Sequence, residues 1–446
     1  MEPHEPHDLN PGPGPDPSRV AVVVAGAGAR GAYEAGVLSV VVPFLRAADI
    51  TPDLFIGTSA GAINATLFAA GAHLPADEQA AAALAVWRSV DIDDVFRPLM
   101  YSGPATIARW AGQLCGIPGI RLTSLVDTAP LARTAHRLVD WRQLAANLDD
   151  RRTSLAVVTT SAATNRTVVF VDRNGADPLP PPDANRAIDY RDVRVTAEHV
   201  LASAAIPALF PAVEVSTPND ARGWYADGGI RLNAPLKPAL SLGAHKLVVV
   251  ATHPAVYPPP VPNTGEEPGP PDVDDMVVRV LDAALVDRMV EDLRTLGKIN
   301  ELVADGRRTG TDRHHHHYVD VPYLFFGPET RGCLGALAAE AFDDRNRWPT
   351  GAWHMLRNPD LLLLGRLLGG DGARRGDLLS YLLFDRGFIN AAICMGRRDA
   401  HLLLAGADQP PWLTGAPKHV PPQRISVHAA LQTHGAGIGA ETTDTA

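Results

Sequence analysis

The chain has 446 residues, of which 46% are hydrophobic and 20% charged, with a formal net charge of −10. This composition is typical of a globular protein with a large core, and mild acidity without a Lys/Arg cluster argues against nucleic acid as the main partner. Three widely spaced cysteines, Cys115, Cys333 and Cys394, fit a reducing compartment better than a disulfide framework.

The first residues predict neither a signal peptide nor a membrane span. Residues 1–18 are rich in proline, glycine, histidine and aspartate, so we expect a disordered arm. This segment is acidic where the start of a signal peptide would be basic. No apolar run in the chain approaches the roughly 18 to 20 residues that cross a bilayer. We therefore expect a cytoplasmic protein without a transmembrane segment, with peripheral membrane contact at most.

Strands and helices alternate at the start of the folded part. Val20–Val24 is a continuous apolar run, typical of a strand buried on both faces of a parallel sheet, and Ala32–Ala47 has helical periodicity. A second strand, Leu54–Ile56, precedes another helical run that ends near Gly71. This order predicts an α/β fold, a three-layer sandwich with a central, mostly parallel sheet.

The remaining elements extend this fold. We expect helices over 73–90, 128–148, 196–204 and 273–304, strands over 155–160, 167–171, 246–252 and 318–326, and helical segments around 333–342, 361–368 and 376–396. Two proline-rich stretches, 174–192 and 254–272, are predicted loops. The predicted organisation is an α/β domain over 19–327, a helical part packed on it over 328–420, and a disordered tail over 421–446.

Ser59 lies at the sharpest predicted turn, in the sequence Gly57-Thr58-Ser59-Ala60-Gly61. A strand, a tight turn and a helix around a serine are typical of a nucleophile elbow, in which the flanking glycines allow close backbone approach. The turn places the hydroxyl at a helix N-terminus, where a developing anion is favoured. At this point a plain glycine-rich turn remains an alternative.

The first strand–helix turn, Gly26-Ala-Gly28-Ala-Arg30-Gly31, offers backbone N–H donors for such an anion, and Ala60 N–H is the second expected source. The turn itself does not require Arg30, whose guanidinium we expect to pin the loop through carbonyls or a carboxylate. The loop also matches the dinucleotide pattern G-x-G-x-x-G. That interpretation requires an acidic residue at the end of the second strand, where Gly57-Thr58-Ser59 stands.

Four motifs in order resemble the patatin-like phospholipase family over about residues 19–250. They are the loop 26–31 followed by Gly36, the elbow 57–61, the block Ala202-Ser-Ala-Ala-Ile-Pro207-Ala-Leu-Phe-Pro211, and Asp227-Gly228-Gly229. The resemblance implies an acyl hydrolase with a Ser–Asp dyad, in which Ser59 is the nucleophile and Asp227 the base. It also implies an oxyanion hole at the glycine-rich loop; the candidate residues are Gly26, Gly28, Ala29, Arg30, Gly31 and Ala60.

Such a dyad requires no histidine. His253 follows a predicted strand and is a better triad candidate than His245, but a structural role is the more common one for such a residue. The run His314–His317 has no cysteine or acidic partner at ligand spacing, so we predict no metal site. Asp172 and Asp192, beside the first proline-rich loop, are expected to be solvated.

The sequence thus predicts a lipid acyl hydrolase, of the phospholipase A or lysophospholipase type, that acts on a lipid or fatty-acyl ester without a cofactor or metal. Three alternatives stay open: a Rossmann-type dinucleotide-binding protein, a catalytically silent lipid-binding module on the same fold, and an acyltransferase.

Overall fold

The computed structural model describes residues 18–95, 128–173, 178–207, 209–256, 288–309, 319–345 and 375–417. Several predictions concern residues outside these ranges: the arm before residue 18, most of the loop 254–272, the first half of the helix 273–304, the helix 361–368, the histidine run 314–317 and the tail 421–446.

The described strands form one nine-stranded sheet, in the order β5-β4-β3-β2-β1-β8-β9, with β7 paired to β3 and β6. The neighbouring strands β3, β2, β1, β8 and β9 of that order run parallel to one another. The strands β4 and β7 run antiparallel to β3. The strands are β1 (Val20–Val24), β2 (Leu54–Thr58), β3 (Ser154–Ser161), β4 (Thr167–Asp172), β5 (Ile188–Asp192), β6 (Val213–Val215), β7 (Gly223–Asp227), β8 (Lys246–Val250) and β9 (Tyr323–Phe326).

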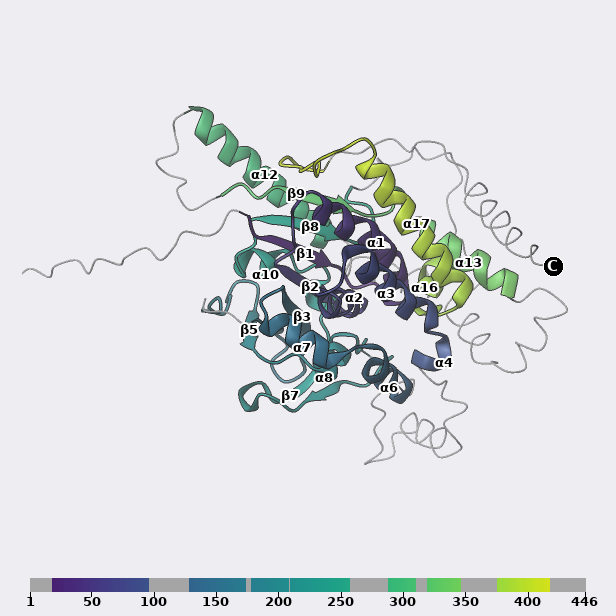
Figure 1. The fold of residues 1–446 in the computed structure, drawn as a ribbon. Helices are drawn as coiled ribbons and strands as arrows, with labels where there is room; N and C mark the ends of the chain where they lie inside the picture. Colours follow the sequence, from purple (N-terminus) through teal and green to yellow (C-terminus); the bar gives the residue numbers. More distant parts are fainter. Residues whose placement is uncertain are drawn as a thin grey trace, which may run out of the picture.

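Helices cover both faces of the sheet (Figure 1). Alternate residues of β1 point to opposite faces: Val22 and Val24 belong to one core cluster, Ala21 and Val23 to the other. The first face carries α1 (Gly31–Ala47), α2 (Ala60–Ala70), α3 (Ala76–Ser89) and α17 (Arg386–Leu404). The second carries α9 (Gly229–Leu232), α10 (Leu236–Ser241) and α12 (Arg288–Thr309). The expected three-layer α/β fold is confirmed.

Other described helical elements complete the fold. They are η1 (Gly28–Arg30), α4 (Ile92–Val95), α6 (Ala129–Leu138), α7 (Trp141–Asp149), α8 (Ala197–Ser203), η3 (Asn219–Ala221), α13 (Cys333–Arg345) and α16 (Arg375–Leu382). Of these, α7, α8, α13 and α16 contribute to the first core cluster. A capping box begins α8, in which Thr196 pairs with His199. The box requires its partner at the third helical position, which His199 occupies.

Four expected boundaries are wrong, each for a local reason. The helix predicted over 128–148 is two helices, because Asp140 caps a new start by accepting from the N–H groups of Arg142 and Gln143. In the same way Asp385 separates α16 from α17. The proline-rich loop 174–192 contains β5, which pairs with β4. The strand predicted over 318–326 begins only at Tyr323.

The C-terminal helix α17 packs closely against α1, and Figure 1 shows the two side by side. A β-carbon on Gly36 would meet the backbone carbonyl of Ile393, and one on Gly396 would meet that of Tyr33. Because each helix presents a glycine to the backbone of the other, the two approach more closely than side chains would allow. Phe388, Ile389 and Ala392 of α17 accordingly lie in the same core cluster as β1 and α1.

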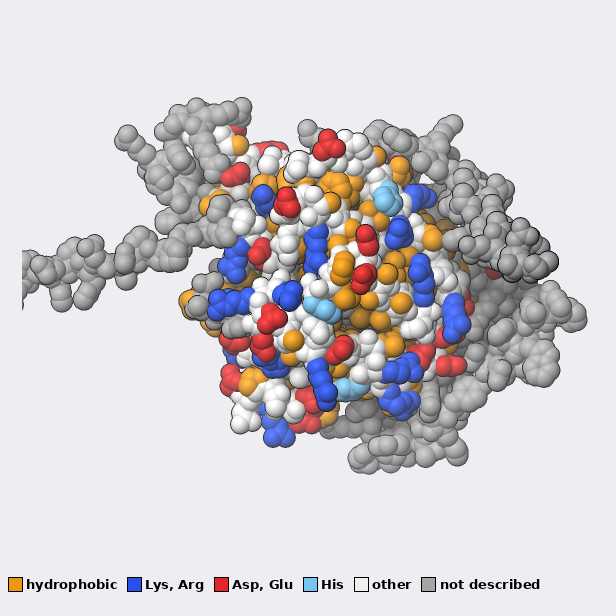
Figure 2. Space-filling model, viewed as in Figure 1, with side chains coloured by type: hydrophobic (Ala, Val, Ile, Leu, Met, Phe, Trp, Pro, Cys, Tyr) orange, Lys and Arg blue, Asp and Glu red, His pale blue; other side chains and the backbone are white. Residues whose placement is uncertain are grey.

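Acidic and basic side chains are interspersed with apolar ones over the face drawn in Figure 2. Within the described ranges, no single helix is both long and apolar enough to cross a membrane. One pair, Gly376–Leu382 with Arg386–Leu404, reaches that length and composition only when its two helices, bent by 100° relative to one another, are taken together.

Candidate active site

Ser59 stands between the end of β2 and the start of α2, with φ 55° and ψ −127°. This left-handed conformation is costly for a residue with a side chain and is concentrated at functional sites. The turn is tight enough that a β-carbon on Gly57 would meet the backbone of Gly61, and one on Gly61 would meet the carbonyls of Val24 and Ala25. The side chain is 4% exposed. The geometry is that of a nucleophile elbow.

A second serine holds this elbow in place. The Ser59 N–H donates to Ser203 Oγ over 2.9 Å, and the Ser203 hydroxyl donates to the Val158 carbonyl of β3 over 2.6 Å. Ser203 was not among the predicted site residues, although it lies in the block 202–211 that carries part of the family resemblance. Its relation to Ser59 depends on a contact across 144 residues, which no local pattern encodes.

The sheet brings Asp227 to the same place as Ser59. Along one edge of β3, Val158 pairs with Thr58 of β2, and the next residue, Thr159, pairs with Asp227 of β7. The opposite edge of β3 is occupied by β4, where Thr159 pairs with Val168. The end of β2 and the end of β7 therefore meet head to head, so Ser59 and Asp227 are brought together although they are far apart in sequence.

The Ser59 side chain lies near the Asp227 carboxylate and favours its ionised form, and Asp227 Oδ1 accepts from the Gly229 N–H over 2.7 Å. It is 5% exposed. Burial raises the pKa of Asp227 to about 6, and the hydrogen bonds from Ser59 and Gly229 limit that rise. The group is thus ionised at neutral pH, yet it is a much stronger base than a solvated carboxylate. Such a base can accept a proton from a neighbouring hydroxyl.

The N–H groups of the loop 26–31 divide into two sets. Those of Gly26 and Arg30 donate to the carbonyls of Asn233 and Ala27, and that of Gly31 donates to carbonyls of the preceding turn. Gly28 and Ala29 begin the turn η1, where a helical N–H has no acceptor within its own helix. Ala60 has the same position in α2. Gly28, Ser59 and Ala60 line one cavity.

Arg30 is 2% exposed, and its guanidinium contacts α16. The guanidinium donates to the backbone carbonyl of Asp377 over 2.9 Å, so the loop is pinned through a carbonyl, as the sequence predicts. The carboxylate of Asp377 lies 3.2 Å away. That the partner belongs to α16 was not predictable from the motif.

His253 belongs to this Arg30 cluster. Its Nε2 lies 3.2 Å from Arg30 Nη1 and 2.9 Å from the Tyr381 hydroxyl. Burial lowers the pKa of His253 well below its usual value, and the charge of Arg30 lowers it further, so the ring is neutral. Within the described part of the chain, no three His, Cys, Asp or Glu side chains are grouped as metal ligands.

Asp172 corrects one expectation. It is buried rather than solvated, and its Oδ2 accepts from the Val195 N–H over 2.7 Å. Burial raises the pKa of Asp172 to about 6. Its exposed neighbour Asp192 ends β5. Asp172 therefore resembles Asp227 in burial and in pKa but contacts a backbone N–H of a connecting segment instead of a serine.

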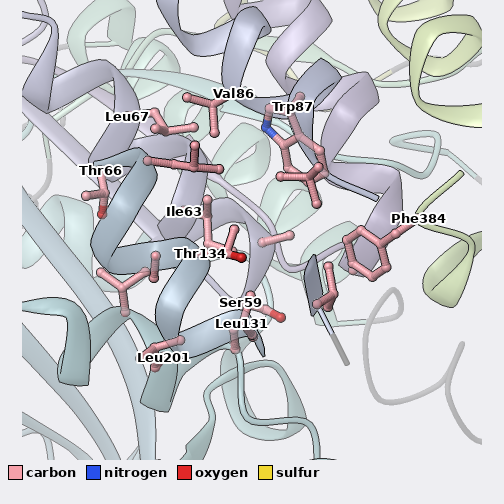
Figure 3. Close-up of a pocket in the computed structure, with 18 of the residues that line it drawn as sticks. Ser59, Ile63, Thr66, Leu67, Val86, Trp87, Leu131, Thr134, Leu201 and Phe384 are labelled. Atoms are coloured by element: carbon pink, nitrogen blue, oxygen red, sulfur yellow. The ribbon is translucent and has the colours of Figure 1, made fainter. Parts of the chain in front are cut away.

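An apolar cavity opens beside Ser59 (Figure 3). Ile63 and Leu67 succeed Ser59 at four-residue intervals, so they line one side of α2 and lead away from the hydroxyl. Trp87 of α3 and Leu201 of α8 contribute further walls, and Phe384 closes the side toward α16 and α17. The lining is almost entirely hydrocarbon, which suits a fatty acyl chain better than a polar ligand.

Comparisons with known proteins give a family match and a similar solved structure. The solved structure of VipD from Legionella pneumophila is similar at 13% identity with a TM-score of 0.30, over 70% of this chain and 62% of that one. The chain thus spans less than two thirds of that structure's length. No curated protein matches. The family model described as patatin-like phospholipase matches residues 22–240, a range that includes Ser59 and Asp227. Residues 22–240 thus form a domain of the patatin-like phospholipase family, whose members are lipid hydrolases.

Proposed function

We propose that this protein is a lipid acyl hydrolase of the phospholipase A or lysophospholipase type, with Ser59 as nucleophile and Asp227 as general base. The observation that supports it best is that these two buried side chains lie beside one another and that Ser59 lines an apolar cavity. A nucleophilic serine requires a base within hydrogen-bond reach, and a lipid ester requires an apolar site for its acyl chain.

In the proposed reaction, Ser59 Oγ attacks the carbonyl carbon of the ester while its proton moves to Asp227. The resulting tetrahedral anion collapses to an acyl-serine, and Asp227 returns the proton to the departing alcohol. A water molecule, deprotonated by Asp227, then attacks the acyl-serine. Collapse of the second tetrahedral anion releases the fatty acid, and the proton returns from Asp227 to Ser59.

We assign the oxyanion donors to the N–H groups of Gly28, Ala29 and Ala60. These begin η1 and α2, whereas the N–H groups of Gly26, Arg30 and Gly31 donate to backbone carbonyls. In this proposal Gly26, Arg30 and Gly31 hold the loop in shape rather than bind the anion. Preorganised donors of this kind contribute much of the rate in acyl transfer. The substrate would reach the cavity by peripheral contact with a lipid surface.

A serine-directed probe tests the assignment. A fluorophosphonate forms a covalent phosphonyl adduct with an activated serine, so intact mass and peptide mapping should place one adduct on Ser59. Hydrolysis of a short-chain nitrophenyl ester and of lysophosphatidylcholine should disappear in Ser59→Ala. Both should fall by about a thousandfold or more in Asp227→Asn, because an amide cannot take the proton.

Two matched variants control for disturbed folding. Ser39→Ala removes another buried serine, and Asp172→Asn neutralises the other buried aspartate of raised pKa; both should retain activity. Full activity in Ser59→Ala would exclude the proposal. Vesicle binding by a wild-type protein that is neither labelled nor hydrolytic would instead favour the silent lipid-binding module. Acyl transfer to an added alcohol in place of fatty acid release would identify an acyltransferase. Unlabelled protein that binds NAD would favour a dinucleotide-binding protein.

A further inference from the structure

The loop that carries the proposed oxyanion donors is held from outside the family-matched residues 22–240. The Arg30 guanidinium extends from the end of η1 into α16. Its Nε donates to Ser380 Oγ over 2.7 Å, and its Nη2 donates to the Asp377 carbonyl over 2.9 Å and to Asp377 Oδ1 over 3.2 Å. Ser380 Oγ in turn donates to the Asp377 carbonyl over 2.6 Å. One turn of α16 thus forms a preorganised socket for the planar guanidinium.

Tyr381 completes this socket. Its ring lies under the guanidinium, with Arg30 Cζ 4.0 Å from the ring centroid. Since arginine can only donate, His253 Nε2 accepts from Arg30 Nη1 and is also 2.9 Å from the Tyr381 hydroxyl. Both His253 and Ser380 are buried. Every nitrogen of the guanidinium therefore has a partner contributed by α16 or by the end of β8.

The backbone of α16 also touches the loop directly. Gly28 has φ +55°, and a β-carbon there would meet the Tyr381 backbone carbonyl. Gly28 and Arg30 are the two ends of η1, so α16 contacts the turn at its first residue through backbone and at its last residue through the guanidinium. The turn has little freedom to rotate between these two contacts.

We infer that α16 is part of the catalytic apparatus, with Ser380 and Tyr381 as positioning residues that act through Arg30 to hold the oxyanion loop against Ser59. The inference rests on the proposed function. Oxyanion donors act only when they are held at hydrogen-bond distance from the place where the charge develops. A displacement on the order of 1 Å can cost about a hundredfold in rate. Ser380 lies outside the cavity lining, so its loss should affect the chemical step rather than binding of the acyl chain.

The test uses the full chain and compares kcat, KM and the rate of fluorophosphonate labelling. Ser380→Ala leaves the Arg30 Nε without an acceptor and should lower kcat and the labelling rate about tenfold to a hundredfold, with KM within about twofold. Ser380→Thr keeps a hydroxyl and should restore most of the rate. Tyr381→Phe keeps the ring under Arg30 but loses the contact with His253, so it should lower the labelling rate by a smaller factor, about threefold to tenfold.

Tyr33→Phe is the matched control. This variant also removes one tyrosine hydroxyl that links the N-terminal and C-terminal parts of the chain. Tyr33 OH donates to Asp399 Oδ2 over 3.0 Å, and its loss leaves the contacts of Arg30 unchanged. The variant should keep wild-type kcat. Wild-type labelling rates in folded Ser380→Ala and Tyr381→Phe would overturn the inference, as would an equal loss in Tyr33→Phe. A wild-type protein without an adduct on Ser59 would refute the proposed function instead, before any α16 variant is compared.

Discussion

Two aspartates, Asp172 and Asp227, are buried and have pKa values raised to about 6 by that burial, but only Asp227 lies beside Ser59. If Asp227 is the base, the reaction requires its ionised form. The labelling rate and kcat/KM should therefore rise with pH through about 6 and level off above pH 7, and at pH 5 they should be about tenfold below the plateau.

The matched variant for this pH profile is Asp172→Asn, which removes the other buried aspartate whose pKa is raised to about 6. The inflection of the rate near pH 6 should persist in Asp172→Asn. The residual activity of Asp227→Asn should show no such inflection. A profile that is flat from pH 5 to pH 8, or an inflection that follows Asp172, would contradict the role given to Asp227.

Glu34 in α1 presents a third buried carboxyl, fully enclosed, which accepts a hydrogen bond from Asn64 Nδ2 over 3.3 Å. Burial raises the pKa of Glu34 well above its usual 4.5. Since the folded state holds this proton more tightly than the unfolded state, wild-type stability falls as pH rises above about 4.5. It does so until the folded-state pKa is reached.

Glu34→Gln removes this linkage. The free energy of unfolding of this variant, measured in urea, should rise relative to that of the wild type as pH rises, by up to about 1.4 kcal/mol per pH unit in that window. The difference in free energy of unfolding between the two proteins should be smallest at about pH 4. Glu340→Gln changes an exposed glutamate of α13 and should show no such trend. A stability difference that does not vary with pH would mean that Glu34 is not protonated in the folded protein.

At the scale of elements, the contact between α1 and α17 rests on Gly36 and Gly396. Alanine normally stabilises a helix by about 1 kcal/mol relative to glycine. In Gly396→Ala, however, the new methyl group meets the Tyr33 carbonyl, so we expect a net loss of about 1 to 3 kcal/mol in the free energy of unfolding. Asn390→Ala, at an exposed position of the same helix, should be neutral or slightly stabilising. Equal effects of the two variants would show that the glycine contact is not tight.

The same elements indicate how far the sequence leads. The strands β1, β2 and β8 and the elbow at Ser59 were predictable, because a buried parallel strand is a continuous apolar run and a glycine-flanked serine has a recognisable local pattern. The breaks at Asp140 and Asp385 were not predicted, since a capping aspartate inside a helical run interrupts no apolar period. The strand β5 was missed because its stability comes from pairing with β4, not from its own composition.

The site divides in the same way. Ser59, Asp227 and the loop 26–31 could be named from motifs that follow one another in the family's order. Ser203 and the socket for Arg30 could not be, because each depends on a contact between distant segments with no local signal. The expectation that His253 has a structural role agrees with its contacts to Arg30 and Tyr381, but those partners became apparent only from the fold.

At the scale of the whole molecule, the described C-terminal helices are part of the main core rather than an appendage. Leu334 of α13, Leu379 of α16 and Phe388 of α17 belong to the same buried cluster as β1 and α1. The family-matched residues 22–240 therefore do not contain the complete first layer of the sandwich. Loss of the segment from α13 onward would expose the apolar face of α1 to solvent.

The hydrogen bond from Arg30 to Ser380 joins residues 350 positions apart, which has a consequence during synthesis. A ribosome completes the glycine-rich loop, the elbow and Asp227 long before α16 emerges. A nascent chain at that stage carries the proposed nucleophile and base but lacks the helix that holds the oxyanion loop. The ester-cleaving centre would then be assembled last, as the C-terminal helices fold onto α1, so unfinished chains would remain inert toward the lipids around them.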